Sequence, residues 1–303
     1  MTSDTRIAVS AWKTAARLVH ISDSHIGPDP GFELHGVNVC RRLTELCQHL
    51  NMLHARGVPI DAVVHTGDLV ADGDSETSDE RSLQLALSLL ATLPAPVLLI
   101  NGNHDNLDAL ADASHHRAVH PKILRPETKL QDSLAGVIDL PSVPWLRLFA
   151  VDARSTPDID PQGFVSDEQL AHLEDVLQSC HQSAQRCLVY LHYPALPLDC
   201  QWLDNGMLIT NGSQLHQLLK RYADTVACVL FGHIHQGLQH LVDGVLYSSV
   251  GALACQFSSW PNDSEPGFDV VSPGFFNYIT VSPQALMIRQ LTVHARGVNN
   301  DGV

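Results

Sequence analysis

Seven side chains that can bind a metal ion follow five short apolar segments of the chain. Each segment is rich in β-branched residues, as expected of a strand that is buried on both faces of a sheet. Open α/β sheets bind their ligands beyond the carboxyl ends of the strands, so we expect these side chains to meet at one site. They are Asp23, His25, Asp68, Asn103, His192, His233 and His235.

Glycines stand directly before three of these ligands, at Gly67, Gly102 and Gly232. A residue without Cβ lets the backbone leave a strand sharply and lets a neighbouring chain come close. In an extended stretch, residues i and i+2 face the same side. We therefore expect the Asp-x-His and His-x-His pairs each to point two ligands at one centre.

The mixture of carboxylates and imidazoles suits Mn, Fe and Zn. A magnesium site would hold mostly oxygen ligands, and a structural zinc site would usually contain thiolate. Seven ligands are too many for one ion, whereas two ions roughly 3.5–4 Å apart are the usual arrangement for hydrolysing phosphate esters. The set therefore predicts two divalent metal ions per chain, of Mn, Fe or Zn.

The order of these blocks resembles the calcineurin-like metallophosphoesterase superfamily over the span from Asp23 to His235. The blocks are Asp-x-His, Gly-Asp, Gly-Asn-His-Asp, His and Gly-His-x-His. Within the superfamily, the segment 192–212 and the Gly-His-Ile-His-Gln motif at 232–236 are most similar to class III cyclic-nucleotide phosphodiesterases and the related glycerophosphodiesterases. Those proteins commonly carry His-His-Pro or His-Pro-Pro where this chain has Tyr193, a difference that bears on substrate shape rather than on metal binding.

The resemblance implies a role for each position. The first metal ion would be held by Asp23, His25 and His235, the second by Asn103, His192 and His233, and both by Asp68. His104 would contact the phosphate and help to neutralise or protonate the leaving oxygen, a role that suits an imidazole titrating near neutrality. Asp105 would orient its neighbours by hydrogen bonds. The implied reaction is in-line attack of metal-bound hydroxide on phosphorus.

These roles predict a dinuclear-metal-dependent phosphodiesterase that hydrolyses a small phosphodiester such as a 3',5'-cyclic nucleotide. A glycerophosphodiesterase or a broad-specificity phosphomonoesterase is the alternative. A non-catalytic scaffold on the same fold is disfavoured because every ligand and His104 are intact. Specificity would come from loops that include 198–211 and 255–273. Four aromatic residues there could either stack on a base or cover the edge of the core: Trp202, Phe257, Trp260 and Phe268.

Composition and charge limit the partners. The chain is 45% hydrophobic and 17% charged, as in globular proteins with ample core. Its formal charge of −15 argues against a nucleic-acid polymer. No window approaches the roughly 18 apolar residues of a membrane helix, and no apolar core marks a signal peptide, so a cytoplasmic location is expected. The expected partner is a small phosphodiester, without nucleic acid or membrane, and a homodimer is left open.

Cysteines and histidines outside the ligand set have structural interpretations. The 7 cysteines contain no CxxC pair and predict buried free thiols. We expect His20 and His65, on strands close to the site, to be hydrogen-bonded in the core. Histidines on predicted helices are expected to face solvent: His49, His54, His172, His181 and His216.

Periodicity alternates between helix and strand as far as residue 237. Helices are predicted over 36–56, 82–93, 166–183 and 211–222, with Ser166 as an N-cap and Gln169 at N3. Further on, strands 237–241 and 245–249 flank an Asp-Gly turn and predict a hairpin, followed by strands 275–281 and 286–293.

The resemblance implies an α/β fold, a four-layer αββα sandwich of two mixed β-sheets flanked by helices. Periodicity alone also permits a three-layer α/β fold. Because the ligands must converge, their whole span has to be one folded unit. We expect an N-terminal tail at residues 1–16, a single metallophosphoesterase domain at 17–296 and a C-terminal tail at 297–303.

Overall fold

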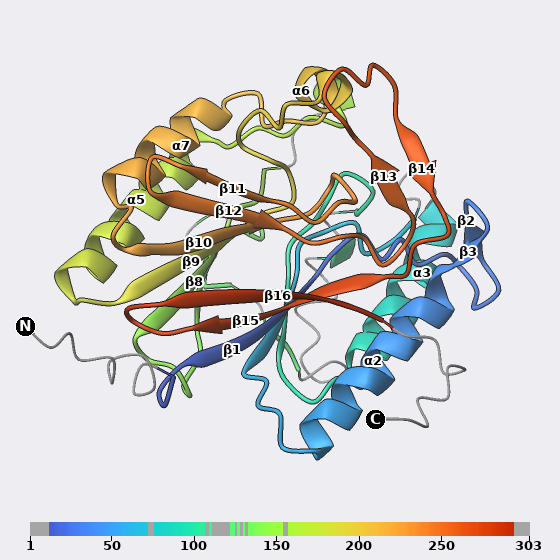
Figure 1. Cartoon of the computed structure of the whole chain (residues 1–303), viewed down its shortest axis with the longest axis horizontal. Helices are drawn as coiled ribbons and strands as arrows, with labels where there is room; N and C mark the ends of the chain where they lie inside the picture. The colour runs from blue at the N-terminus through green and yellow to red at the C-terminus, as the bar shows by residue number, and fades with distance from the viewer. Residues whose placement is uncertain are drawn as a thin grey trace, which may run out of the picture.

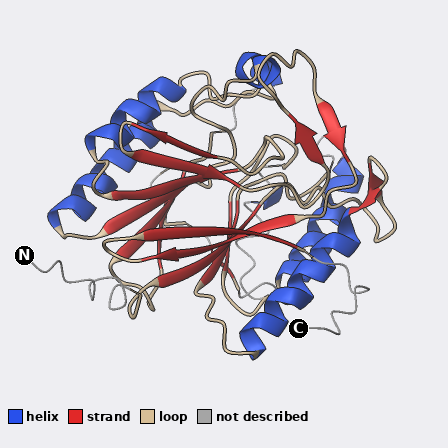
Figure 2. Cartoon of the chain, in the orientation of Figure 1, coloured by secondary structure: helices blue, strands red, loops and turns tan. Residues whose placement is uncertain are grey.

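Two β-sheets of six strands each form the centre of the molecule (Figure 1, Figure 2). The computed structural model describes residues 12–71, 76–106, 109–110, 122–124, 126–127, 130, 133–153 and 157–293. Helices lie on the outer face of each sheet, at the lower right and the upper left of Figure 1. The four-layer αββα sandwich expected from the resemblance is confirmed.

The first sheet is mixed and has the order β16-β15-β1-β4-β5-β6. Its strands are β1 (Ala16–Ile21), β4 (Ala62–His65), β5 (Val97–Leu99), β6 (Ile123–Leu124), β15 (Phe275–Val281) and β16 (Leu286–Thr292). β1, β4, β5 and β6 run parallel, and β15 lies antiparallel to β1. β1 begins at Ala16, the last residue of the expected N-terminal tail.

The second sheet is also mixed and has the order β11-β12-β10-β9-β8-β7. Its strands are β7 (Gly136–Asp139), β8 (Leu146–Ala150), β9 (Arg186–Tyr190), β10 (Val226–Phe231), β11 (Gln239–Val242) and β12 (Val245–Ser249). β8, β9, β10 and β12 run parallel. β11 and β12 pair across the Asp243-Gly244 turn, as the sequence predicted.

The two faces of strand β10 pack in two different hydrophobic cores. Cys228 and Leu230 belong to the core that contains residues of both sheets, whereas Val229 and Phe231 pack under the helices α5 (Asp167–Gln182) and α7 (Gly212–Arg221). Successive side chains of a strand point to opposite faces, so a sheet buried on both faces needs the continuous apolar run seen here.

The predicted helices form, with shifted boundaries. α2 spans Val39–Ala55, and α3 spans Glu76–Leu90, so α3 begins earlier than the sequence suggested. Ser166 caps α5 by accepting the N–H of Gln169 at 3.3 Å. The Gln169 side chain does not complete a capping box. It pairs with both the N–H and the carbonyl of Asp152 instead, which docks α5 against the end of β8.

Short elements were not predicted. They are the hairpins β2 (Glu33–Leu34) with β3 (Val37–Asn38) and β13 (Gln256–Ser258) with β14 (Gly267–Asp269), the 3₁₀ helix η1 (Pro157–Ile159) and the helix α6 (Gln201–Gly206). The β13–β14 hairpin stands at the upper right of Figure 1, beside α6. The N–H of Trp202 in α6 donates to the Asp263 carbonyl between β13 and β14.

Two histidine predictions were wrong. His172 and His216 were expected to face solvent from their helices, yet both are buried. His172 meets the ring of Phe149 edge-on, and His216 Nδ1 lies 2.9 Å from the Tyr247 hydroxyl. Imidazole is amphipathic enough to occupy the inner side of a helix when a polar partner is near, which helical periodicity does not reveal.

Other expectations are confirmed. All seven cysteines are free and buried. His20 Nε2 lies 2.9 Å from Thr66 Oγ1, and His65 Nε2 lies 3.0 Å from Ser24 Oγ. In the described part of the chain, no helix has the length and apolar character that crossing a bilayer requires.

Candidate metal centre

Five parallel strands deliver the candidate ligands to one edge of the two sheets. In the first sheet, Asp23 comes shortly after β1, Asp68 after β4 and Asn103 after β5. In the second sheet, His192 comes after β9 and His233 after β10. Because the strands of each set run in the same direction, their carboxyl ends lie at a common edge.

The backbone at these strand ends is left-handed, which corrects the expectation of extended geometry. The φ angles are 53° at Asp23, 45° at His25, 53° at Asp68, 70° at His233 and 47° at His235. Such values cost residues other than glycine about 1–3 kcal/mol each and persist only where the surroundings fix them. The Asp23 N–H donates to the Gly67 carbonyl, and the His25 N–H to the Asp68 carbonyl, both at 3.0 Å. The paired ligands thus converge through tight turns rather than strand alternation.

None of the three predicted glycines leaves room for a side chain, and a Cβ on Gly67 would lie 2.6 Å from His192 Nδ1. A Cβ on Gly102 would lie 2.1 Å from Asp68 Oδ1, and a Cβ on Gly232 would lie 1.9 Å from Ser22 Oγ. Both distances are far below van der Waals contact. The glycines therefore allow one ligand loop to pack directly on the next, as the sequence predicted.

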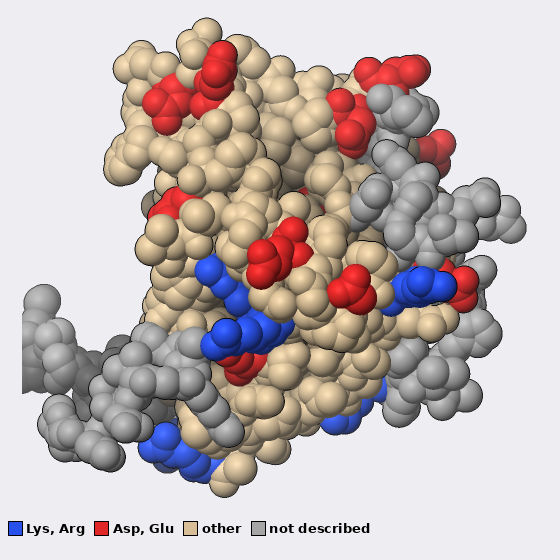
Figure 3. All heavy atoms as spheres, turned by 90° about the vertical axis from the view of Figure 1, so that its right-hand side faces the viewer, with Lys and Arg blue, Asp and Glu red and all other residues tan. Residues whose placement is uncertain are grey.

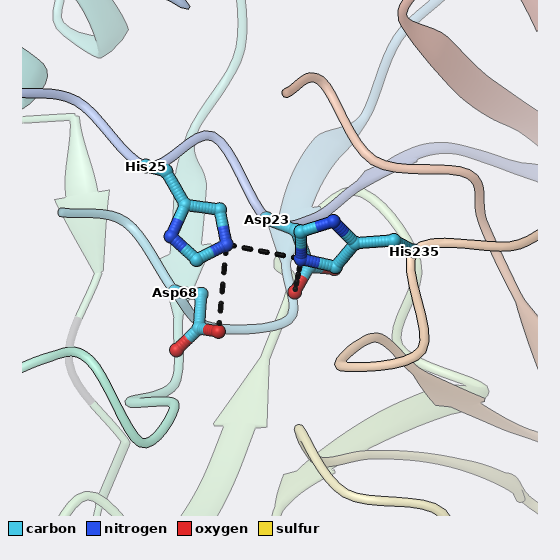
Figure 4. A group of neighbouring side chains, drawn as sticks. All are labelled: Asp23, His25, Asp68 and His235. Carbon is cyan, nitrogen blue, oxygen red and sulfur yellow. Dashed lines mark hydrogen bonds and ion pairs between the residues drawn. The ribbon is translucent and has the colours of Figure 1, made fainter. Parts of the chain in front are cut away.

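The first group of candidate ligands joins both sheets (Figure 4). Asp23, His25, Asp68 and His235 offer ligand atoms that lie within 4.8 Å of one another. His25 Nε2 lies 3.0 Å from His235 Nε2 and 3.6 Å from Asp68 Oδ2, and His235 Nε2 lies 3.5 Å from Asp23 Oδ1. Each of the four residues is exposed by 4% or less. Two imidazoles and two carboxylates in a buried cluster can hold a divalent cation.

A second group shares Asp68 with the first. Asp68, His192 and His233 also offer ligand atoms within 4.8 Å of one another. His192 Nε2 lies 3.3 Å from Asp68 Oδ2 and 3.3 Å from Asn103 Oδ1. His233 Nε2 is buried and has no hydrogen-bond partner among the described residues. A buried polar atom without a partner costs about 1–3 kcal/mol, and coordination of a cation would remove that cost.

Backbone carbonyls orient two of the histidines. His192 Nδ1 lies 2.7 Å from the Thr66 carbonyl oxygen, and His235 Nδ1 lies 2.8 Å from the Cys255 carbonyl oxygen. A carbonyl only accepts hydrogen bonds, so each neutral ring carries its proton on Nδ1 and keeps a lone pair on Nε2. Metal-binding histidines are oriented in this way. Sequence reasoning missed both carbonyls because no side chain marks them.

Burial dominates the electrostatics of the site. Burial lowers the pKa of His25 well below its ordinary range and that of His235 to about 4, and it raises the pKa of Asp23 to about 7. Burial also opposes a charge on His192, but Asp68 outweighs it and raises the pKa of His192 to about 9. The lowered pKa values keep His25 and His235 unprotonated, which is the form in which imidazole binds a metal ion. A cation bound at His192 would have to displace the proton that Asp68 favours there.

His104 lies beside the first group rather than within it. Its backbone N–H donates to Asp68 Oδ1 at 3.0 Å, and its ring Nδ1 lies 3.1 Å from the Ala71 carbonyl oxygen. The ring meets that of His25 edge-on, with centroids 4.9 Å apart. His104 is only half-buried, whereas the histidines of both groups are buried. This position leaves Nε2 available to a molecule that binds beside the two groups.

Asp105 ties two ligand loops together, in the orienting role expected from the sequence. Its Oδ1 accepts the N–H groups of Leu69 and Val70 at 2.9 and 3.1 Å, and its Oδ2 accepts the N–H of Gly102 at 2.8 Å. The loop that carries Asp68 and the loop that carries Asn103 are therefore held by one buried carboxylate.

Tyr193 packs beside the second group. Its ring lies 4.9 Å from that of His192 and 4.8 Å from that of His233, between centroids, and the residue is buried. Tyr193, which stands where the similar proteins carry His or Pro, therefore contacts two candidate ligands directly. Its effect on the site is exerted through the packing of those rings.

Sequence comparisons identify the family. The family profile of calcineurin-like phosphoesterases matches residues 16–237. A 3',5'-cyclic adenosine monophosphate phosphodiesterase CpdA from Pseudomonas aeruginosa is 29% identical over 261 residues, which cover 85% of this chain and 83% of that protein. A glycerophosphodiester phosphodiesterase GpdQ from Enterobacter lignolyticus is 26% identical over 281 residues, which cover 92% of each chain.

A solved structure shares the fold. The dimetal phosphatase from Danio rerio superposes with a TM-score of 0.63 at 15% sequence identity, covering 92% of this chain and 99% of that one. At this identity the likeness concerns the fold alone, and the family assignment rests on the profile. The chain belongs to the calcineurin-like phosphoesterase family and is a metal-dependent phosphoric ester hydrolase.

Proposed function

We propose that this protein is a dinuclear phosphodiesterase that hydrolyses a small phosphodiester such as a 3',5'-cyclic nucleotide. The observation that carries the proposal is the position of Asp68, whose carboxylate belongs to both groups of candidate ligands. A carboxylate shared between two ions offsets their mutual repulsion. Two separate sites would not need such a residue.

The residues fit two ions in the assignment expected from the sequence. Asp23, His25 and His235 would hold the first, Asn103, His192 and His233 would hold the second, and Asp68 would be shared by both. The orphaned His233 Nε2 and the close approach of His25 Nε2 to His235 Nε2 both favour cations here. The mixed nitrogen and oxygen ligands suit Mn, Fe or Zn. When bound, such ions supply an acidified water molecule and positive charge for the phosphoryl oxygens.

His104 contributes the proton chemistry in this proposal. Its Nδ1–H is fixed by the Ala71 carbonyl, so its Nε2 is the atom that meets the phosphate. When the ring is doubly protonated, Nε2–H donates a hydrogen bond to a phosphoryl oxygen or passes its proton to the leaving oxygen, which leaves the neutral Nδ1–H imidazole. Its backbone N–H holds Asp68, which links the position of the acid to that of the bridging carboxylate.

The choice of a small diester rests on the relatives and on surface charge. The relatives named above act on cyclic adenosine monophosphate or on glycerophosphodiesters. Figure 3 shows the side of the molecule that lies at the right of Figure 1, where the described Lys and Arg side chains form no continuous band. A polyanionic backbone needs such a band, and the chain carries a formal charge of −15.

A substrate panel on metal-loaded protein tests the proposal. The panel compares cyclic nucleotides, a glycerophosphodiester, a generic aryl diester and an aryl monoester. We expect a higher kcat/KM for cyclic nucleotides than for the monoester. Preference for the glycerophosphodiester would select the alternative diesterase, and turnover of the monoester alone would refute the proposal.

A further inference from the structure

A pocket of about 390 Å³ opens beside the first group of candidate ligands. His235 forms one part of its lining, and the rest comes from the residues after His235, from the β13–β14 hairpin and from β15 and β16. We call it the hairpin pocket. Its volume lies within the range of about 300–1,000 Å³ that small-molecule sites occupy. His235 therefore borders both the first group of candidate ligands and the hairpin pocket.

Two aromatic residues of the β13–β14 hairpin, Phe257 and Trp260, line this pocket. The ring of Phe257 is stacked on that of His235, with centroids 4.1 Å apart and planes 4° from parallel. Phe268 does not line the pocket itself, but its ring contacts that of Phe257 edge-on, with centroids 5.5 Å apart. Trp260 also lines the pocket, and it is 67% exposed. Within the described chain its indole has no stacking partner, so the largest aromatic surface in the lining is free.

Trp260 is exposed on a backbone that is held in place. Its N–H donates to Asp263 Oδ2 at 2.8 Å, and its carbonyl accepts the N–H of Asp263 at 3.0 Å. Asp263 in turn accepts the N–H of Trp202 and so attaches the hairpin to α6. These hydrogen bonds fix the backbone position from which the indole projects. This arrangement favours a binding role over an incidental exposed tryptophan.

Apart from the His235 imidazole, the polar side chains of the pocket are neutral amides and hydroxyls, with one exception. The Gln290 amide lies against Gly237, where a Cβ would come within 1.8 Å of Nε2, and it makes no side-chain hydrogen bond among the described residues. The exception is Asp269, whose carboxylate accepts hydrogen bonds from Val271 and Ser272. None of the described residues that line the pocket is Lys or Arg. The lining therefore offers no cation to a second phosphate or a carboxylate, whereas it suits a neutral group with donors and acceptors.

We propose that the hairpin pocket binds the nucleobase of a nucleotide substrate, with the base stacked on Trp260 and its edge hydrogen-bonded to Gln290. A nucleobase is planar, which matches the exposed indole of Trp260, and neutral, which matches a lining without Lys or Arg among the described residues. Its edge carries donors and acceptors that match the Gln290 amide. A glycerol headgroup has no flat face for the indole. This inference rests on the proposed function, because it identifies the organic part of that diester.

The test compares Trp260→Ala and Gln290→Ala with matched controls. Leu241→Ala removes an equally exposed apolar side chain from β11, and Gln284→Ala removes an exposed amide from the β15–β16 turn. Hydrolysis of 3',5'-cyclic AMP and of glycerophosphoethanolamine is measured for each metal-loaded variant. Calorimetry with adenosine, which has no phosphate, reports binding to the pocket without catalysis.

Stacking of a base on an aromatic side chain contributes binding free energy that Trp260→Ala would remove. We therefore expect this variant to lower kcat/KM for cyclic AMP and affinity for adenosine by roughly 5- to 150-fold. Loss of one hydrogen bond in Gln290→Ala should lower both by about 2- to 10-fold. Turnover of glycerophosphoethanolamine should stay within about twofold in all variants, because the metal centre is untouched.

Two results would overturn the inference: no binding of adenosine to the unmodified protein, or equal adenosine affinity and cyclic AMP turnover in Trp260→Ala and Leu241→Ala. Failure of the proposed function looks different, since the unmodified protein would then hydrolyse neither diester. Binding of adenosine that depends on Trp260 would in that case still support the pocket as a nucleobase site.

Discussion

The metal centre and the hairpin pocket are neighbours that are built in opposite ways. At the centre, five candidate ligands have left-handed backbone, and the ligand loops pack on glycines and share buried hydrogen bonds. In the hairpin pocket, Trp260 is exposed and Gln290 makes no side-chain hydrogen bond among described residues. His235 belongs to both regions. Its Nε2 lies near His25 in the first group of ligands, and its ring is stacked on Phe257 of the pocket.

This difference separates the reaction from the choice of substrate. Chemistry on a phosphate requires fixed distances between ions, carboxylates and an acid, so the centre tolerates little movement. Recognition of the rest of the substrate requires a surface that can change without disturbing those distances. Substitutions in the two regions should therefore have distinct signatures in metal content, catalysis and stability.

The largest effect is expected for Asp68→Asn. The change removes a negative charge from between two dications, so both sites should lose affinity by more than the 10–100-fold that follows loss of a supporting partner. Activity should fall below detection. Calorimetric metal titration is the measurement, with Asn103→Ala as the matched variant that removes a neutral ligand from the second site alone. Tight binding of two ions by Asp68→Asn would show that the carboxylate is no bridge.

His104→Ala should separate binding from catalysis within the centre. We expect both metal sites to fill while kcat falls by roughly 10²–10⁴-fold, since the variant loses a positioned acid or phosphate contact. Metal analysis alongside steady-state kinetics checks this expectation. A loss of metal from the variant would instead place His104 among the ligands.

A third substitution, Gly102→Ala, probes the packing of the ligand loops. The added methyl group would lie 2.1 Å from Asp68 Oδ1, so the two loops must separate. Overpacking of this kind costs typically about 1–3 kcal/mol of stability, and metal affinity should fall as well. Thermal unfolding with and without metal measures both effects. An unchanged Tm together with unchanged metal binding would mean that the loops are not tightly coupled.

The smallest effect is expected for the stability of Trp260→Ala. Its side chain is exposed, so the free energy of unfolding should change by no more than about 0.5 kcal/mol. Thermal unfolding of the variant beside Gly102→Ala compares the two regions directly. A destabilisation equal to that of Gly102→Ala would make Trp260 part of the core, and the distinction between the regions would disappear.

Residue type and order predicted most of the architecture and the list of candidate ligands. Apolar runs that end in Asp, Asn or His marked strand ends, and the run of β10 shows why, since both of its faces are buried. The positions 23, 68, 103, 192 and 233 could be assigned to one edge because parallel strands share their direction.

Tertiary contacts determined what the sequence did not reveal. At the left-handed turns, the Asp23 N–H donates to the Gly67 carbonyl and the His233 N–H donates to the Asp23 carboxylate. The carbonyls of Thr66 and Cys255 orient histidines from remote segments and have no side-chain signature. Gln290 reaches the hairpin pocket from a strand far along the chain, and periodicity carries no information about such an approach.

Metal content measured together with activity tests the central claim most directly. Protein stripped by a chelator is titrated with Mn²⁺, and bound ions per chain and hydrolysis of 3',5'-cyclic AMP are recorded at each step. A shared Asp68 predicts that activity is absent without metal and reaches its maximum only as the second ion binds. Full activity with one ion per chain, or activity that survives removal of all metal, would contradict the dinuclear assignment.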